Sequence, residues 1–129
     1  MRRRKARELA LRMLYQMETN GEDPELALLA YCQSFPYQQP VIDYTKVLLG
    51  GVRRYKEQID AWVAAASEHW RPGRITYVDR NILRIGAYEM LFSQDVPVKV
   101  AIDEAIELGK KYGSEDSREF INGVLDKIM

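Results

Sequence analysis

The sequence predicts an all-α protein, and three observations carry that prediction. Apolar residues recur with the helical period in every long segment, and no segment sustains the two-residue alternation of a half-buried strand. Turn and capping signals separate these segments. Hydrophobic residues make up 47% and charged residues 29% of the 129 residues, which is typical of a globular protein with a real core. We therefore expect residues 1-129 to form one domain, a compact bundle of about seven helices.

The first predicted helix covers about residues 4 to 18 and ends at the turn pair Asn20 and Gly21. Its apolar stripe consists of Ala6, Leu9, Ala10, Met13, Leu14 and Met17. The second helix starts at Asp23-Pro24-Glu25, because Asp caps a helix well, Pro suits the first helical position and an acid suits the first turn. We expect its buried face to comprise Leu26, Leu29 and Ala30. A loop with two prolines, residues 34–40, follows.

The third segment keeps a helical rhythm for about 25 residues from Val41 onward. Gly50 and Gly51 interrupt it, and each glycine inside a helix costs about 1 kcal/mol. We therefore expect the segment to bend or split at these glycines. Trp70-Arg71-Pro72-Gly73 is expected to end it.

The helix after that is predicted to lie at the centre of the bundle. Thr76-x-x-Asp79 resembles a capping box with Asp in place of Glu, and it marks the start of the helix. Apolar residues then cover most of the helix circumference, as in a helix that is surrounded by others. These residues are Val78, Ile82, Leu83, Ile85, Gly86, Ala87, Met90 and Leu91.

Two more helices complete the prediction. The turn Asp95-Val96-Pro97 precedes a helix over about residues 101 to 111, with Gly113 as its expected C-cap. The last helix carries apolar residues from Phe120 to the end of the chain. Asn122 and Gly123 usually mark a turn, but the apolar spacing runs straight through them, so we expect the helix to continue.

No pattern in the sequence indicates catalysis, a metal or a cofactor. Gly50 and Gly51 lack the Lys-Ser/Thr of a phosphate-binding loop, and His69 is the only histidine. Cys32 is the only cysteine, which excludes an internal disulfide and suits a reducing compartment. Glu104 and Glu107 are expected to form a solvated face rather than an acid–base pair. With no apolar run of about 20 residues and no signal sequence, we expect a cytoplasmic protein that is not an enzyme.

The charge of the chain is zero overall but concentrated at one end. Residues 1–12 carry six cations and one anion, Glu8, so the remaining residues sum to −5. The cations are Arg2, Arg3, Arg4, Lys5, Arg7 and Arg12. A helix N-terminus is itself partially positive, so this placement is unfavourable unless an anion lies nearby. A solvated tail would tolerate it, but the cluster runs directly into a helix and is rich in arginine, which favours a polyanionic partner.

Three stretches carry a resemblance that covers almost the whole chain. They are "RRRKARELALRMLYQ", "DRNILRIGAYEMLF" and "VPVKVAIDEAIELGKKYGSEDSREFINGVLDKI". They resemble the NusB family of bacterial transcription antitermination factors. The resemblance implies an all-α fold of seven helices and binding of boxA RNA together with NusE, a ribosomal small-subunit protein. It also implies a larger complex with NusA, NusG and RNA polymerase on ribosomal RNA operons.

The resemblance assigns roles to particular residues of this sequence. It implies that the basic start contacts RNA through Arg3, Arg4, Lys5 and Arg7. It adds the start of the last helix to the RNA surface, with Glu115, Asp116, Ser117 and Phe120, the phenylalanine offering its ring to an unstacked base. Tyr15 and Asp79 match positions that contact NusE, although some relatives carry Glu where Asp79 stands.

Two alternatives remain at this point. One is the NusB-like RNA-binding module of an RNA methyltransferase, which would require a cofactor-binding domain beyond residue 129. The other is a structural homodimer whose arginines pair with acids of the neighbouring copy. The sequence decides neither between monomer and homodimer nor which RNA sequence is bound.

Overall fold

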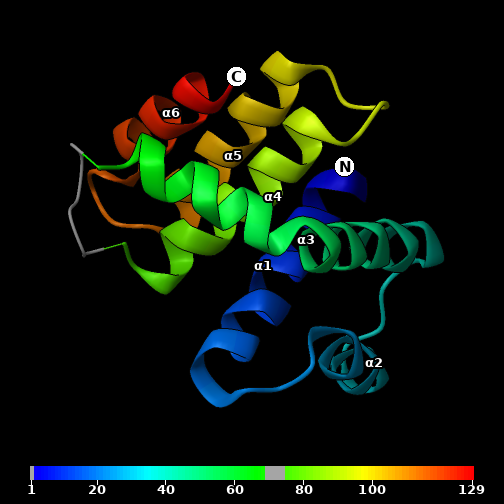
Figure 1. Cartoon of the computed structure of the whole chain (residues 1–129). Helices are drawn as coiled ribbons and strands as arrows, with labels where there is room; N and C mark the ends of the chain where they lie inside the picture. Colours follow the sequence, from blue (N-terminus) through cyan, green and yellow to red (C-terminus); the bar gives the residue numbers. More distant parts are fainter. Residues whose placement is uncertain (1, 69–74) are drawn as a thin grey trace.

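The computed structural model describes residues 2–68 and 75–129, and these residues form six α-helices without a strand (Figure 1). The helices are α1 (Arg2–Asn20), α2 (Pro24–Ser34), α3 (Gln39–Ala66), α4 (Tyr77–Leu91), α5 (Val98–Tyr112) and α6 (Ser117–Ile128). The predicted all-α class is therefore confirmed, and the expected number of helices is nearly right. None of these helices is both long enough and apolar enough to cross a membrane.

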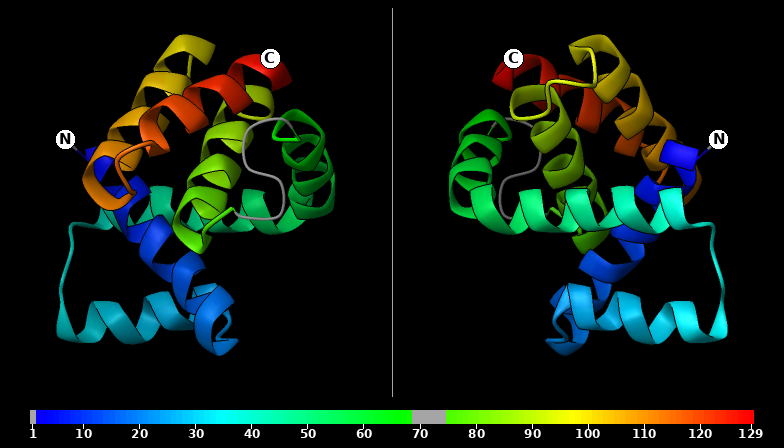
Figure 2. Two further views of the ribbon diagram at one scale, coloured as in Figure 1. Left: turned by 90° about the vertical axis from the view of Figure 1, so that its left-hand side faces the viewer. Right: turned by 90° about the vertical axis from the view of Figure 1, so that its right-hand side faces the viewer.

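Helix α4 lies at the centre of the bundle, as its apolar circumference predicted. It packs against α1, α3, α5 and α6, and the seven residues from Asn81 to Ala87 are all buried. Buried apolar residues from all six helices form one hydrophobic cluster around it. Helix α2 lies at the edge, where its main contacts are with α1 and α3 (Figure 2).

The predicted capping signals act as expected. The carboxylate of Asp23 accepts hydrogen bonds from the backbone N–H groups of Glu25 and Leu26, at 2.9 and 3.3 Å. The hydroxyl of Thr76 accepts one from the N–H of Asp79 at 3.1 Å. Gly21 directly follows the end of α1 and has a φ of 74°, a conformation that glycine adopts without strain. Helix α6 runs through Asn122 and Gly123, also as predicted.

The prediction for the buried face of α2 was wrong. Ala27 and Leu28 face the core, whereas Leu26 and Leu29 are 66% and 56% exposed and Ala30 is exposed as well. The five residues from 26 to 30 are all apolar, so their spacing does not single out one face. The contacts with α1 and α3 decide which side is buried.

Helix α3 is bent but not split. It runs without a break from Gln39 to Ala66, and Figure 1 shows it changing direction along its length. Of the two glycines, Gly51 has the clearer structural role, because a Cβ atom there would lie 2.1 Å from the ring of Tyr88 on α4. A Cβ at Gly50 would meet nothing within 4 Å. The predicted stop at residues 70–73 lies outside the described residues.

A buried arginine ties three helices together at the far end of α1. Arg84 on α4 is 3% exposed, and its guanidinium donates two hydrogen bonds to Asp60 on α3, at 2.8 and 2.9 Å. It also donates to Glu18 on α1. Such a bidentate contact fixes both the distance and the orientation of the helices that it joins.

Candidate nucleic-acid interface

The basic cluster forms the first turns of α1, as the sequence predicted. The helix begins at Arg2, and its first turn contains no acidic residue. Arg2, Arg3, Arg4 and Lys5 are exposed, whereas Arg7 is only 5% exposed. The cations therefore divide into an exposed group and one buried member.

Arg7 is held by a buried carboxylate. Its Nε donates to Oε1 of Glu89 on α4 at 2.8 Å, and the Glu89 side chain is 1% exposed. The hydroxyl of Tyr44 on α3 donates to the other oxygen of Glu89. Burial and this hydrogen bond raise the pKa of Tyr44, so the phenol stays neutral and remains a donor. Arg7 thus joins α1 to α4 within the core.

Arg4 is also paired, at the surface. Its Nε and Nη2 donate to the two oxygens of Glu104 on α5, at 3.0 and 2.7 Å. Nη1 of Arg7 reaches the same carboxylate at 3.3 Å. The hydrogen bond from Arg4 and the charge of Arg7 lower the pKa of Glu104. The expectation of a merely solvated Glu104 was therefore wrong.

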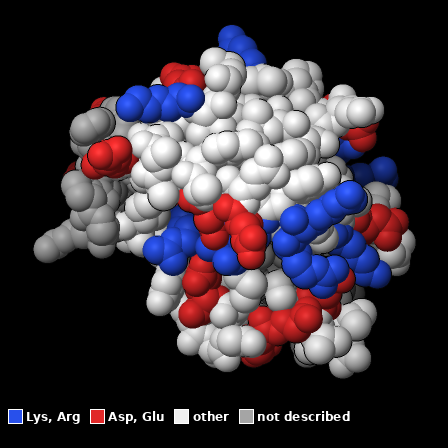
Figure 3. Space-filling model, in the orientation of Figure 1, with Lys and Arg blue, Asp and Glu red and all other residues white. Residues whose placement is uncertain are grey.

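The remaining cations of α1 differ in how far they are neutralised. Arg3 lies 3.7 Å from Asp95 and stacks over the ring of Tyr44, with 4.4 Å to the ring centre. Within the described part of the chain, no carboxylate pairs with Arg2, Lys5 or Arg12. Figure 3 shows basic and acidic side chains next to one another on one face of the molecule. The basic cluster is thus only partly unneutralised, because Arg4 and Arg7 are paired with carboxylates.

The residues at the start of α6 also divide into exposed and buried ones. Glu115 and Asp116 are exposed in the connection between α5 and α6. Ser117 is 1% exposed; its hydroxyl donates to Asp79 at 2.7 Å and accepts from the N–H of Ser114 at 2.9 Å. Phe120 is 2% exposed, so the structure places its ring in the core rather than where a base could stack on it.

The two predicted NusE-contacting residues lie at different depths. Tyr15 is 42% exposed and meets Tyr77 edge to face, with ring centres 6.5 Å apart. It lines a surface hollow of about 390 Å³ together with Leu11 and Val78. Asp79 is fully buried and accepts the hydrogen bond from Ser117, so it connects α4 to α6 from below the surface.

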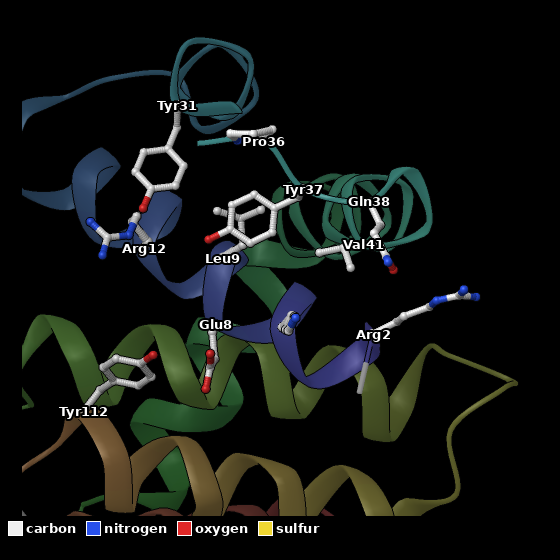
Figure 4. Close-up of a pocket in the computed structure, with 11 residues that line it drawn as sticks. Arg2, Glu8, Leu9, Arg12, Tyr31, Pro36, Tyr37, Gln38, Val41 and Tyr112 are labelled. Carbon is white, nitrogen blue, oxygen red and sulfur yellow. The ribbon is translucent and has the colours of Figure 1, made fainter. Parts of the chain in front are cut away.

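A groove beside α1 was not predicted. It has a volume of about 620 Å³ and lies between α1, the connection from α2 to α3, and the end of α5 (Figure 4). Arg12, Tyr31, Tyr37 and Tyr112 line it, together with Lys5 from the predicted set. The helical spacing of Lys5 and Arg12 places them on one face of α1, which was a usable signal. The tyrosines come from separate segments, and no local pattern brings them together.

Comparisons with known proteins agree with the resemblance. The model of the NusB family matches residues 4–129. The transcription antitermination protein NusB of Anaeromyxobacter dehalogenans is 48% identical over 128 residues, which cover 98% of this chain and 89% of that protein. NusB of Desulfitobacterium hafniense is 44% identical over 131 residues, covering 100% of this chain and 88% of that protein.

Solved structures give the same result. NusB of T. maritima superimposes with a TM-score of 0.84 at 37% identity, covering 98% of this chain and 89% of that one. A chain from a crystal structure of antitermination factors NusB and NusE in complex with dsRNA superimposes with a TM-score of 0.86 at 29% identity. That match covers 98% of this chain and 95% of the other. This chain belongs to the NusB family.

Proposed function

We propose that this protein is a transcription antitermination factor that binds boxA-type RNA together with NusE. The observation that carries the proposal is the similarity along nearly the whole chain to proteins named transcription antitermination protein NusB. The fold match to a NusB chain crystallised with NusE and RNA supports both partners. The role includes a larger assembly with NusA, NusG and RNA polymerase on ribosomal RNA operons in the cytoplasm, and it requires no catalytic step by this chain.

The proposed RNA surface runs from the start of α1 to the connection between α5 and α6. Positive charge and hydrogen-bond donors come from Arg3, Lys5 and the exposed part of the Arg4 side chain. Glu115 and Asp116 border the surface. Their negative charges repel phosphates, and their carboxylates can accept hydrogen bonds from RNA. Lys111 at the end of α5 bonds to Glu8 of α1 at 2.8 Å, so these segments lie side by side.

Three residues of the predicted RNA set act from inside the protein in this proposal. Arg7 holds α1 against α4, Ser117 holds the start of α6 against α4, and Phe120 packs α6 into the core. They position the exposed groups. Arg4 and Arg7 pair with carboxylates of their own chain, so neither needs acids from a second copy, as the homodimer alternative required.

The proposed NusE surface centres on Tyr15 and the hollow beside it. Tyrosine is favoured at protein interfaces because its ring buries a large apolar area while its hydroxyl finds a polar partner. Tyr77, which contacts Tyr15, is 43% exposed and extends this aromatic area. Asp79 lies just beyond, at the first turn of α4, and contributes by fixing that turn.

A binding experiment tests the proposal. Fluorescence anisotropy would compare a labelled boxA-type RNA with a scrambled RNA, with and without NusE, at two salt concentrations. We expect tighter binding of the boxA-type RNA and a further gain with NusE. Arg3→Gln with Lys5→Gln should weaken binding and reduce the salt slope by about 1.4, since each phosphate contact on single-stranded RNA contributes about 0.7.

The matched control is Arg53→Gln with Arg54→Gln, which removes two exposed cations from α3. This control should bind RNA as the unchanged protein does. Equal affinity for the boxA-type and scrambled RNAs with NusE present would contradict the proposal.

A further inference from the structure

The groove beside α1 combines cations and aromatic rings in one concave surface. Its volume of about 620 Å³ lies within the range of roughly 300–1,000 Å³ that is typical of small-molecule sites. Figure 4 shows Arg12 between Tyr31 on one side and Tyr112 on the other. Arg2 and Arg12 lie ten positions apart on α1, so the groove follows that helix for about 15 Å at 1.5 Å per residue.

The groove carries the cations of α1 that the protein itself does not neutralise. Arg2, Lys5 and Arg12 line it, and among the described residues none of them has a carboxylate partner. The one acid in the groove, Glu8, is paired with Lys111. The groove is therefore positively charged, whereas Arg4 and Arg7 do not line it and pair with Glu104 and Glu89.

The aromatic rings of the groove come from three elements. Tyr31 lies on α2, Tyr37 in the connection to α3 and Tyr112 at the end of α5. The guanidinium of Arg12 lies 5.0 Å from the ring centre of Tyr31, and the rings of Tyr31 and Tyr37 are 6.4 Å apart. Tyr112 is 43% exposed, so part of its ring is open to a ligand.

We infer that this groove binds unstacked nucleotides of single-stranded RNA, with Lys5 and Arg12 on phosphates and the tyrosines stacking on bases. This inference rests on the proposed function and extends its RNA surface along α1. Single-stranded RNA is bound by grooves in which cations follow the backbone and aromatic side chains or arginine planes stack on the bases. The occupant is RNA rather than an acidic peptide, because a peptide carboxylate would use the cations but would not use the exposed aromatic surface of Tyr112, whereas a base can stack on it.

Continuity with the proposed RNA surface supports the same occupant. Lys5 belongs to both, at the start of α1. At the other end, Tyr112 directly precedes the connection that carries Glu115 and Asp116. An RNA strand that crosses the start of α1 can therefore enter the groove without leaving the protein surface.

Arg12→Gln and Tyr112→Leu test this inference against a closely matched control. Arg54→Gln removes another exposed arginine that stacks on a tyrosine, at 5.4 Å from the ring centre of Tyr55. With a labelled single-stranded boxA-type RNA and no NusE, we expect Arg12→Gln to weaken binding and to lower the salt slope by about 0.7. Tyr112→Leu should weaken binding at least about fivefold, the lower end of the loss of one base stack. Arg54→Gln should change neither quantity.

A second measurement does not depend on the variants. RNA carrying 5-iodouridine crosslinks to neighbouring aromatic rings under light, and mass spectrometry should locate the crosslinks at Tyr31, Tyr37 or Tyr112. Circular dichroism confirms that each variant is folded.

The possible outcomes separate this inference from the proposed function. If Arg3→Gln with Lys5→Gln weakens RNA binding but Arg12→Gln and Tyr112→Leu do not, the groove is not an RNA site and the proposed function stands. If Arg12→Gln weakens binding of NusE and not of RNA, the groove is a protein contact and the inference is wrong. If the unchanged protein with NusE does not prefer the boxA-type RNA, the proposed function itself fails.

Discussion

Replacing Arg7 by methionine tests whether this arginine is structural rather than an RNA contact. Methionine keeps much of the length of the side chain but removes its charge and donors. Glu89, which is 1% exposed, would then lose the one cation that contacts it among the described residues and would keep only the hydrogen bond from the Tyr44 hydroxyl. Removing one member of a buried ion pair costs about 3 to 5 kcal/mol, because the other charge is left in the core.

The loss should be large in a thermal unfolding experiment. For a chain of 129 residues, 1 kcal/mol corresponds to roughly 3 to 5 °C in Tm, so we expect Arg7→Met to lower Tm by about 10 to 25 °C. Arg4→Met is the matched control, because it removes an arginine one turn away whose side chain is 46% exposed. Pairs at the surface contribute little, so Tm should hardly change in the control.

The double variant Arg7→Met with Glu89→Gln separates the lost pair from other effects. It removes the stranded charge, so it should recover much of the stability that Arg7→Met loses. Equal Tm values for Arg7→Met and Arg4→Met would refute the reasoning. They would mean that the pair with Glu89 contributes little to holding α1 against α4.

Two further predictions concern packing and pH. Gly51→Ala places a Cβ against the ring of Tyr88 and should destabilise the protein by about 1 to 3 kcal/mol, whereas Gly50→Ala has open space and should stabilise it by up to about 1 kcal/mol, both measured by urea unfolding. Arg4 and Arg7 lower the pKa of Glu104 in the folded protein. The Glu104 carboxylate therefore stabilises the fold at pH values above its unfolded pKa of about 4.3, and this contribution disappears as the pH falls through the lower folded pKa. The free energy of unfolding of Glu104→Gln should therefore fall less between neutral and acid pH than that of the unchanged protein. The same fall in both proteins would contradict a stabilising pair between Arg4 and Glu104.

The sequence predicted the helices well because their signals are local. Apolar periodicity located the central helix α4, and the caps at Asp23 and Thr76 marked helix starts that the structure confirms. The face of α2 was mispredicted because an unbroken apolar run has no unique face. Gly50 and Gly51 were predicted to bend or split α3, but the ring of Tyr88 that requires a glycine at position 51 lies 37 positions away in the chain, on α4.

The site was harder to predict because charge partners are not encoded locally. Residues 2–7 were identified as a basic cluster, but nothing near them indicates that Glu89 pairs with Arg7, 82 positions away, or that Glu104 pairs with Arg4, 100 positions away. Three of the predicted site residues, Arg7, Ser117 and Asp79, turned out to be buried hydrogen-bonding residues, and their roles toward RNA and NusE remain proposals. The groove tyrosines meet only in the folded chain.

The structure gives a physical answer to the unfavourable placement of cations at a helix N-terminus. Carboxylates of α4 and α5 neutralise one side of α1, which offsets the repulsion by the helix dipole on that side. Arg2, Lys5 and Arg12 on the groove side have no carboxylate partner among the described residues, so the electrostatic cost is confined to the surface where we propose that RNA binds. Because salt screens exposed charges far more than buried pairs, added salt should weaken RNA binding while it leaves the attachment of α1 to the bundle almost unchanged.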